Sequence, residues 1–391
     1  MSEVSAKNKI TLCKRGLVIV SFNRISNLII VIVTLVVAIV MVEVCSFLII
    51  KKLPMYESRW VFREKKPPAY ANSPYFNADF IRESAKGERS KLDDKVRRLI
   101  NFEGKYINVI DGHRRTAFVP EGAINTVYIY GASTIYSQEV PDEYTIPSQV
   151  QRKINEISAE YKVVNYGLAS MNVEQQLYLL QETSLKEGDI VIFFDGGCDI
   201  INNVYRGYER GLNRNSPSNS GENDIVESIV LPALEGIKLY NFSKLLKYIK
   251  LKSPPSNVRN ADEIKARAIK ASSNFAKNIL QAHQYSKTSG ADFYHFLQPS
   301  IFSLSARTKH EQFLIDNFLL TPPGMEFVYT LSIDAFVDQS NLLNSKGVVS
   351  IDLRHILDNR QGEVFLDFAH TTERANEIIA TAIFSMIRWK R

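Results

Sequence analysis

A continuous apolar run near the N-terminus limits what the first part of this chain can form. Residues 28–50 (LIIVIVTLVVAIVMVEVCSFLII) carry a single charged side chain, Glu43. A helix of about 20 apolar residues spans the hydrocarbon core of a bilayer, whereas the helices of soluble cores are rarely apolar on every face. A cleaved signal peptide has an apolar stretch of only about 7–15 residues, followed by a small-residue cleavage site. We therefore predict one uncleaved transmembrane helix.

Neither charge nor cysteine content decides on which side of a membrane the rest of the chain lies. Five basic residues precede the predicted span and six follow it within residues 51–66, so the positive-inside rule gives a near tie. Cys13 precedes the span, Cys45 lies within it and only Cys198 follows, so the remainder of the chain cannot form an internal disulfide. The formal net charge of +6 is too small an excess to indicate nucleic acid as a partner.

The chain divides into four predicted parts. An N-terminal tail (1–27) precedes the transmembrane helix (28–50), and residues 51–104 follow as a stalk or as a segment laid over the body, because their first half is charged, proline-rich and without periodicity. Residues 105–391 form the predicted main domain, with an insertion at about residues 204–260. The insertion either covers a cleft or decorates the body without contacting substrate.

Short apolar runs alternate with helical patterns in the main domain. The predicted strands are 126–130, 161–165, 189–194 and 291–299, and the predicted helices are 147–160, 173–186, 262–289 and 372–389. Such alternation indicates an α/β fold with a mostly parallel sheet covered on both faces. Ligands of these sheets bind beyond the carboxyl ends of the strands. Polar residues follow three of the predicted strands there, at 131–134, 165–170 and 195–199.

Two short motifs carry residues suited to nucleophilic catalysis. GAST (131–134) places Ser133 directly after a buried strand, although Ile135 stands where the nucleophile elbow G-x-S-x-G has its last glycine. DFAH (367–370) places Asp367 and His370 on one loop, where the carboxylate can bind one ring nitrogen while the other faces a nucleophile. Taken alone, each motif is more often an ordinary turn or surface loop.

The order of these residues, with the serine first and the Asp–His pair near the C-terminus, resembles the SGNH/GDSL hydrolase superfamily. Four blocks match in order: GAST (131–134), VNYGLAS (164–170), FFDGGCD (193–199) and LDFAH (366–370). The resemblance covers residues 105–205 and 265–391. Within it, KYINVIDGHRRT (105–116) is similar to the lead-in of members encoded with polysaccharide-assembly genes.

The resemblance implies an SGNH-like (flavodoxin-like) three-layer sandwich and a serine esterase that needs no cofactor and no metal. Ser133 would be the nucleophile, His370 the general base, and Asp367 the residue that orients the imidazole. The backbone N–H groups of Ser133 and Ser170 would stabilise the oxyanion.

The oxyanion residues depart from the family pattern at two positions. Ser170 stands where the second block usually has glycine, but its contribution is a backbone N–H that serine also carries. Cys198 stands where the third block usually has asparagine, and a thiol is a weak donor. Loss of one oxyanion donor costs about 10²–10³ in rate, so slow, specialised or absent catalysis is open. Cys198 could also be a nucleophile itself, with His370 as its base.

The predicted function is that of a membrane-anchored serine esterase acting on carboxylic esters. The resemblance and the apolar helix together imply an O-acetylated cell-surface polysaccharide as substrate, with the catalytic domain outside the cytoplasmic membrane. Thr134 and Asp199, which follow the nucleophile and Cys198, are assigned to substrate binding. Alternatives are acyl transfer to a second alcohol, a catalytically degenerate protein for glycan binding or assembly, and a lipid esterase favoured by the apolar part of the insertion.

The remaining motifs indicate little further chemistry. The basic turn HRRT (113–116) either grips an anionic sugar or is simply solvated. The other histidines have no metal-ligand spacing, and the sequence contains neither a P-loop nor a GxGxxG phosphate loop. No nucleic acid is expected as a partner.

Overall fold

The computed structural model describes residues 27, 29–49, 68–93, 96–207, 242, 245–246, 258, 260–317 and 320–389. Nearly all of the predicted N-terminal tail and most of the predicted insertion lie outside the described residues. The chain separates into two units, of which one holds residues 1–55 and 220–250 and the other residues 56–219 and 251–391. The domain boundaries expected from the sequence stay a prediction.

The first unit contains the expected apolar helix. Ile29–Ile49 forms a helix with a mean hydropathy of 2.9, which is long and apolar enough to cross a membrane by length and composition. Its single carboxylate, on Glu43, accepts a hydrogen bond from the backbone N–H of Phe242 at 3.0 Å. The charge in the apolar run therefore has a polar partner within this unit.

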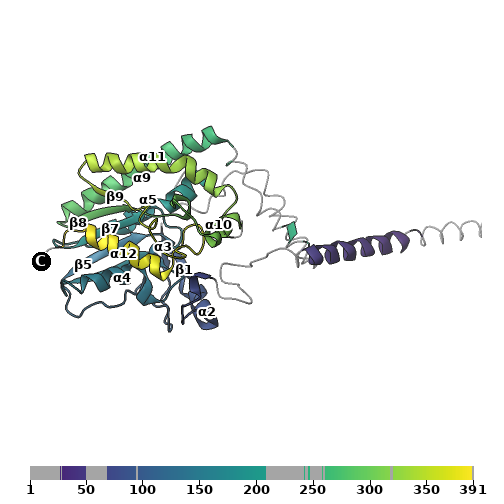
Figure 1. Cartoon of the computed structure of the whole chain (residues 1–391), viewed down its shortest axis with the longest axis horizontal. Helices are drawn as coiled ribbons and strands as arrows, with labels where there is room; N and C mark the ends of the chain where they lie inside the picture. Colours follow the sequence, from purple (N-terminus) through teal and green to yellow (C-terminus); the bar gives the residue numbers. More distant parts are fainter. Residues whose placement is uncertain are drawn as a thin grey trace, which may run out of the picture. The chain divides into compact units, whose positions relative to one another are not determined.

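The second unit is built on a seven-stranded sheet (Figure 1). Its strand order is β3 (Val109–Ile110), β4 (His113–Arg114), β6 (Tyr161–Gly167), β5 (Asn125–Gly131), β7 (Ile190–Asp195), β8 (Asp292–Leu297) and β9 (Val349–Asp352). The five strands from β6 to β9 pair in parallel, and β3 and β4 pair antiparallel at one edge. The predicted mostly parallel sheet is confirmed.

Helices cover both faces of this sheet, as the fully buried central strand requires. Every side chain of β7 is buried, because parallel strands in the middle of such a sheet have no solvent face. Val191 and Phe193 point into one apolar cluster, whereas Ile190, Ile192 and Phe194 point into the other. The first cluster lies under α5 (Val173–Gln181), α9 (Ala261–Thr288) and α11 (Met325–Ser345), and the second under α4 (Ile146–Ile154) and α12 (Glu373–Met386). The predicted three-layer α/β architecture is confirmed (Figure 1).

Several elements differ from their predicted bounds. The helices expected at 147–160 and 173–186 end early, at Ile154 and Gln181, and α11 and β9 carry no prediction at all. The long helix α9 lies within one residue of its predicted ends. Its Asn260 side chain accepts from the backbone N–H groups of Asp262 and Glu263, which is the N-cap arrangement that starts a helix.

The described part of residues 51–104 packs on the sheet unit. It contains η1 (Pro68–Tyr70), α2 (Ala78–Gly87) and a separate hairpin of β1 (Ser90–Asp93) and β2 (Val96–Leu99). Its aromatic side chains Tyr70, Tyr75, Phe76 and Phe80 form a small buried cluster with two residues from outside the segment. These are Ile107 and Leu366, and Leu366 adjoins the Asp–His loop. This segment therefore reaches the end of the sheet where the candidate site lies.

Candidate active site

The sheet register brings three of the four sequence blocks together. Gly131, at the end of β5, pairs with Gly167 on β6 and with Phe194 on β7. Since all three strands are parallel, the residues that follow them emerge at the same edge of the sheet. Ser133, Ser170 and Cys198 follow β5, β6 and β7 in turn.

Ser133 begins α3 (Ser133–Tyr136), a four-residue helix that two buried groups on β6 hold in place. The side chain of Asn165 donates to the carbonyl of Ile135 at 3.0 Å and accepts from the N–H of Gly167 at 2.8 Å. A Cβ on Gly167 would lie 2.1 Å from the backbone nitrogen of Tyr136, so only glycine permits this close approach. The turn that carries Ser133 is thus rigidly seated against its neighbouring strand.

The Asp–His loop comes from the far end of the chain, just before α12. One oxygen of the Asp367 carboxylate, Oδ1, accepts from the backbone N–H groups of Ala369 at 2.9 Å and His370 at 2.8 Å. The N–H of Leu366 donates to the carbonyl of His370 at 2.8 Å and closes the loop. These bonds occupy Oδ1 and leave Oδ2 directed at the imidazole.

Ser133, His370 and Asp367 form a continuous hydrogen-bonded line. Nδ1 of His370 lies 2.7 Å from Oδ2 of Asp367, and Nε2 lies 2.8 Å from Oγ of Ser133. A carboxylate can only accept, so Nδ1 carries the proton and Nε2 is left to accept from the serine hydroxyl. This is the arrangement in which an imidazole can take the proton of an attacking hydroxyl.

The side-chain exposure of this line falls from the nucleophile inward. Ser133 is half-buried, whereas the side chains of His370 and Asp367 are 12% and 6% exposed. A carboxylate with so little water contact interacts strongly with the charge that develops on the imidazole. The nucleophile can be reached from solvent while its partners are shielded.

A second carboxylate lies beside the same imidazole, and the sequence did not indicate it. Oε1 of Glu139 is 3.8 Å from Nε2 of His370, and the Glu139 side chain is only 2% exposed. Glu139 follows α3 by three residues, in a segment without any recognisable motif. His370 therefore has a carboxylate near each of its ring nitrogens.

The two positions that depart from the family pattern lie close to the nucleophile strand. Ser170 has a φ of +60°, in the left-handed region where glycine is favoured. The structure thus gives a reason for the usual glycine, and the Ser170 carbonyl is held by the side-chain amide of Asn202 at 3.1 Å. Cys198 is buried in α6 (Gly197–Asp199), directly after β7.

A cationic side chain reaches this region from the β1–β2 hairpin. Arg97 on β2 donates from Nη2 to the carbonyl of Ala169, next to Ser170. Burial lowers the pKa of its guanidinium, while electrostatic interactions with Glu88 and Cys198 act in the opposite direction. An arginine stays protonated near neutral pH, so Arg97 supplies positive charge beside the second and third blocks.

The residues assigned to substrate binding are both buried. The side chain of Thr134 lies inside the fold at 3% exposure, and Asp199 is fully buried. Oδ1 of Asp199 accepts from the backbone N–H of Val173 at 3.2 Å, at the start of α5. Burial, and the neighbouring charge of Asp195, raise the pKa of Asp199 well above its ordinary value. In this structure Asp199 ties the third block to α5.

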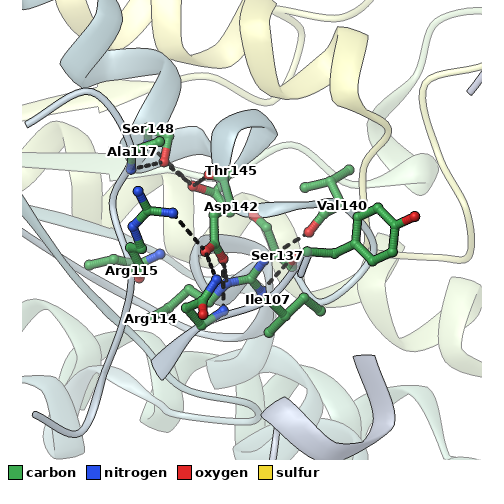
Figure 2. A network of polar contacts seen from close by, with 12 residues as sticks. Ile107, Arg114, Arg115, Ala117, Ser137, Val140, Asp142, Thr145 and Ser148 are labelled. Carbon is green, nitrogen blue, oxygen red and sulfur yellow. Dashed lines mark hydrogen bonds and ion pairs between the residues drawn. The ribbon is translucent and has the colours of Figure 1, made fainter. Parts of the chain in front are cut away.

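The two arginines of the basic turn at residues 113–116 lie in different environments (Figure 2). Arg114 is buried, with its Nε 2.7 Å from Oδ1 of Asp142, whereas the side chain of Arg115 is about half exposed and lies 3.8 Å from the other oxygen. The guanidinium of Arg114 also donates to the carbonyls of Tyr136 and Ser137 at 3.2 and 3.3 Å. Arg114 therefore fixes the end of α3 and is not available to a ligand.

A second line of acid, imidazole and hydroxyl groups crosses the interior of the sheet. Nε2 of His295 is 3.1 Å from Oδ1 of Asp195, and Nδ1 is 2.6 Å from Oγ of Ser350, which in turn contacts Ser340. All four side chains are buried, and Asp195, His295 and Ser350 lie on the adjacent strands β7, β8 and β9. Because no ester can reach this serine, the line satisfies polar groups within the core.

Residues missed by sequence reasoning are those whose role depends on distant contacts. Asn165 lies within the second block, but its contacts with α3 and Gly167 were not predicted; its position on the buried face of β6 was a usable signal, since a buried amide needs specific partners. Glu139 and Arg97 had no such signal, because each meets the site only through the folded chain. Among the described residues, no three His, Cys, Asp or Glu side chains gather in a way that could hold a metal ion.

Known proteins that are similar to this chain are found among solved structures. No family model matches the chain, and no curated protein matches it either. Among solved structures, a member of the lipolytic G-D-S-L family from Veillonella parvula DSM 2008 is similar at 12% identity over 67% of this chain and 100% of that one, with a TM-score of 0.38.

Two further solved structures are esterases by their descriptions. An acetyl xylan esterase, AlAXEase, is 12% identical over 67% of this chain and 100% of its own, with a TM-score of 0.32. A carbohydrate acetylesterase family member from Sinorhizobium meliloti is 12% identical over 68% of this chain and 97% of its own, with a TM-score of 0.32. The three solved structures named here are thus described as a lipolytic G-D-S-L family member and as two acetylesterases.

Proposed function

We propose that this protein is a serine hydrolase of carboxylic esters, with Ser133 as nucleophile. The observation that carries the proposal is the hydrogen-bonded line from Asp367 through His370 to Ser133, with contacts of 2.7 and 2.8 Å. Ser133 attacks the ester carbonyl while Nε2 of His370 takes the hydroxyl proton. The same nitrogen then protonates the departing alcohol, and water repeats the sequence on the acyl-enzyme.

The oxyanion is proposed to form beside the three strand ends. The strands that precede Ser133 and Ser170 end at the same edge of the sheet. The backbone N–H groups of these two residues would donate to the oxyanion, with Cys198 in the place of the usual amide. Arg97 supports this assignment, because its guanidinium binds the carbonyl next to Ser170 and its charge interacts with Cys198. A positive charge here would favour a developing oxyanion even though a thiol is a weak donor.

More specifically, the proposed function is that of a membrane-anchored esterase that acts on an O-acetylated cell-surface polysaccharide, with its catalytic domain outside the cytoplasmic membrane. The apolar helix Ile29–Ile49 supports the anchor by its length and composition. A reporter fused after residue 391 that is active only outside the cytoplasm tests the placement. A reporter active only in the cytoplasm would refute it.

The esterase proposal is tested on the full chain in detergent and on its Ser133→Ala variant. We expect a serine-reactive fluorophosphonate to label the natural protein and an activated acetyl ester to be hydrolysed, and both signals to vanish with Ser133. Ser350→Ala is the matched control, because that serine contacts a histidine but is buried. Labelling that persists without Ser133 would refute the assignment.

A second candidate function is a catalytically degenerate protein that binds or helps to assemble glycans. Cys198 is the observation that favours it, because the usual amide donor is absent from the third block. Folded protein that is neither labelled nor active on acetyl, longer-chain or acceptor-supplemented esters would favour this second function.

A further inference from the structure

Glu139 is the second carboxylate beside the imidazole of His370. Its Oε1 lies 3.8 Å from Nε2 of His370, and that nitrogen is also 2.8 Å from the hydroxyl of Ser133. Asp367 occupies the opposite nitrogen at 2.7 Å. The imidazole is thus placed between two carboxylates, only one of which the Ser–His–Asp line employs.

The position of Glu139 is fixed by its backbone neighbours. The hydroxyl of Tyr70 donates to the Glu139 carbonyl at 2.8 Å, and Ser84 and Gln138 exchange two hydrogen bonds of 2.8 and 3.0 Å just before it. Arg114 donates to the carbonyl of the following residue at 2.9 Å. With its backbone held on both sides and its side chain 2% exposed, the carboxylate has little freedom to move away from His370.

A negative charge at this place is energetically unfavourable unless a positive charge nearby compensates for it. A buried carboxylate loses its hydration, and next to the nucleophile it also repels the negative charge that forms on the substrate. The same carboxylate stabilises a positive charge on His370, because opposite charges within about 4–6 Å favour each other's ionised form. His370 becomes positively charged whenever it takes the proton of Ser133 or of water.

We propose that Glu139 is a positioning residue that stabilises the imidazolium form of His370 from the Nε2 side. The inference rests on the proposed esterase function. In each step the proton moves from the attacking hydroxyl to Nε2 and then to the departing oxygen, and Glu139 takes no part in the proton transfer. Asp367 sets the tautomer and the ring orientation, and Glu139 adds charge stabilisation where the proton arrives.

The other charged groups around this site have partners of their own. Glu373 on α12 accepts from Ser73 at 3.3 Å, and burial together with that charge raises the pKa of Tyr75 far above its ordinary value, so Tyr75 stays neutral. Beyond η6 (Ile301–Ser303), Arg307 pairs with Glu326 at 2.7 Å. Arg97 lies on the side of the second block. Among the described residues, Asp367 and Glu139 are the carboxylates within 4 Å of the His370 ring nitrogens.

The test compares the natural protein with Glu139→Gln, which keeps the shape of the side chain and removes its charge. In the full chain in detergent, kcat/KM for an activated acetyl ester is measured from about pH 5 to about pH 9. We expect the acidic limb of the profile to move to lower pH by about one unit and kcat to fall about tenfold to hundredfold. Glu139→Asp should give a smaller shift, because it keeps the charge at a greater distance.

Two measurements separate this role from a structural one. The first is an NMR titration of the histidine ring carbons, with the His370 signal assigned from His370→Asn; its midpoint should fall by the same amount in Glu139→Gln. The second is the matched control Glu143→Gln, which removes an exposed carboxylate from the same segment and should change neither profile.

Each outcome decides a different question. An unchanged acidic limb and an unchanged midpoint in folded Glu139→Gln overturn the inference, and so does a lower kcat without any shift. If the natural protein is neither labelled at Ser133 nor active, the proposed esterase function fails, and the NMR titration still decides whether Glu139 acts on His370.

Discussion

Replacing Asp367 by asparagine should nearly abolish esterase activity while leaving the loop intact. In the structure, Oδ1 of Asp367 accepts two backbone N–H groups, and Oδ2 accepts from Nδ1 of His370. An asparagine can keep the two backbone bonds through its one carbonyl oxygen. Its NH₂ group then faces Nδ1, so the imidazole must present a lone pair there and carry its proton on Nε2.

The wrong tautomer explains the expected size of the loss. A protonated Nε2 cannot accept the hydroxyl proton of Ser133, which lies 2.8 Å away. An exchange of this kind in a Ser-His-Asp triad lowers kcat by about 10⁴, which corresponds to about 5.4 kcal/mol in the activation barrier. Because the backbone bonds remain, the melting temperature should change little.

The assay is kcat/KM for an activated acetyl ester, together with the rate of fluorophosphonate labelling and a thermal melt. Asp358→Asn is the matched control, since Asp358 forms a similar contact of 3.1 Å with His355 three residues away, at an exposed site. That variant should keep its activity. If Asp367→Asn stays within about tenfold of the natural protein while Ser133→Ala is inactive, the tautomer argument is refuted.

Three further predictions concern the oxyanion blocks and the buried acid. Cys198→Asn should raise turnover by about tenfold or more, because a side-chain amide donor is restored; no change in an active enzyme would mean that the thiol position does not limit the rate. Ser170→Ala should leave kcat/KM within about threefold, since the proposed donor is the backbone N–H, and a hundredfold loss would contradict this. Burial and the charge of Asp195 raise the pKa of Asp199 in the folded state. Between about pH 4 and that raised pKa, the folded state therefore binds more protons than the unfolded state. The free energy of unfolding then falls as the pH rises through this range. The melting temperature of Asp199→Asn relative to the natural protein should therefore increase with pH over that range, and a constant difference would contradict the assignment.

The core of the fold was predictable because its strands and helices obey simple periodicities. β7 has only apolar residues before its terminal aspartate, and the long helix α9 buries Ile264, Ala268, Ala271 and Phe275 at helical spacing. The edge strand β9 has four residues with only one fully buried side chain, so it left no comparable pattern. α11 has apolar residues on more than one face and so lacks a clear stripe.

Prediction of the candidate site depended on the order of the four blocks more than on any single motif. Ser133 and His370 are 237 residues apart, and neither GAST nor DFAH alone distinguishes a nucleophile from a turn. The structure places them in contact because parallel strands share one edge and because α12 packs against the second apolar cluster. Glu139 could not be predicted, since its distance from His370 is set by the hydrogen bond from Tyr70 to its own carbonyl and by the bonds between Ser84 and the neighbouring Gln138.

The basic turn shows why local charge is a poor guide to binding. HRRT suggested a solvated or sugar-binding patch, yet Arg114 has no exposed side-chain area and pairs with Asp142, 28 residues later. A paired buried charge of this kind is costly to break, and its other bonds go to the end of α3. The arginine thus positions the turn that carries Ser133, and only Arg115 keeps an exposed cation.

The segment before the sheet supports the site at several separate points. Tyr70 holds the backbone of Glu139, Ser84 holds Gln138, and Arg97 holds the carbonyl next to Ser170. Leu366, which adjoins the Asp–His loop, is buried in the aromatic cluster of the same segment. Because a buried polar group that loses its partner costs about 1–3 kcal/mol, residues 68–104 act energetically as part of the candidate active site, whatever their role as a link to the apolar helix.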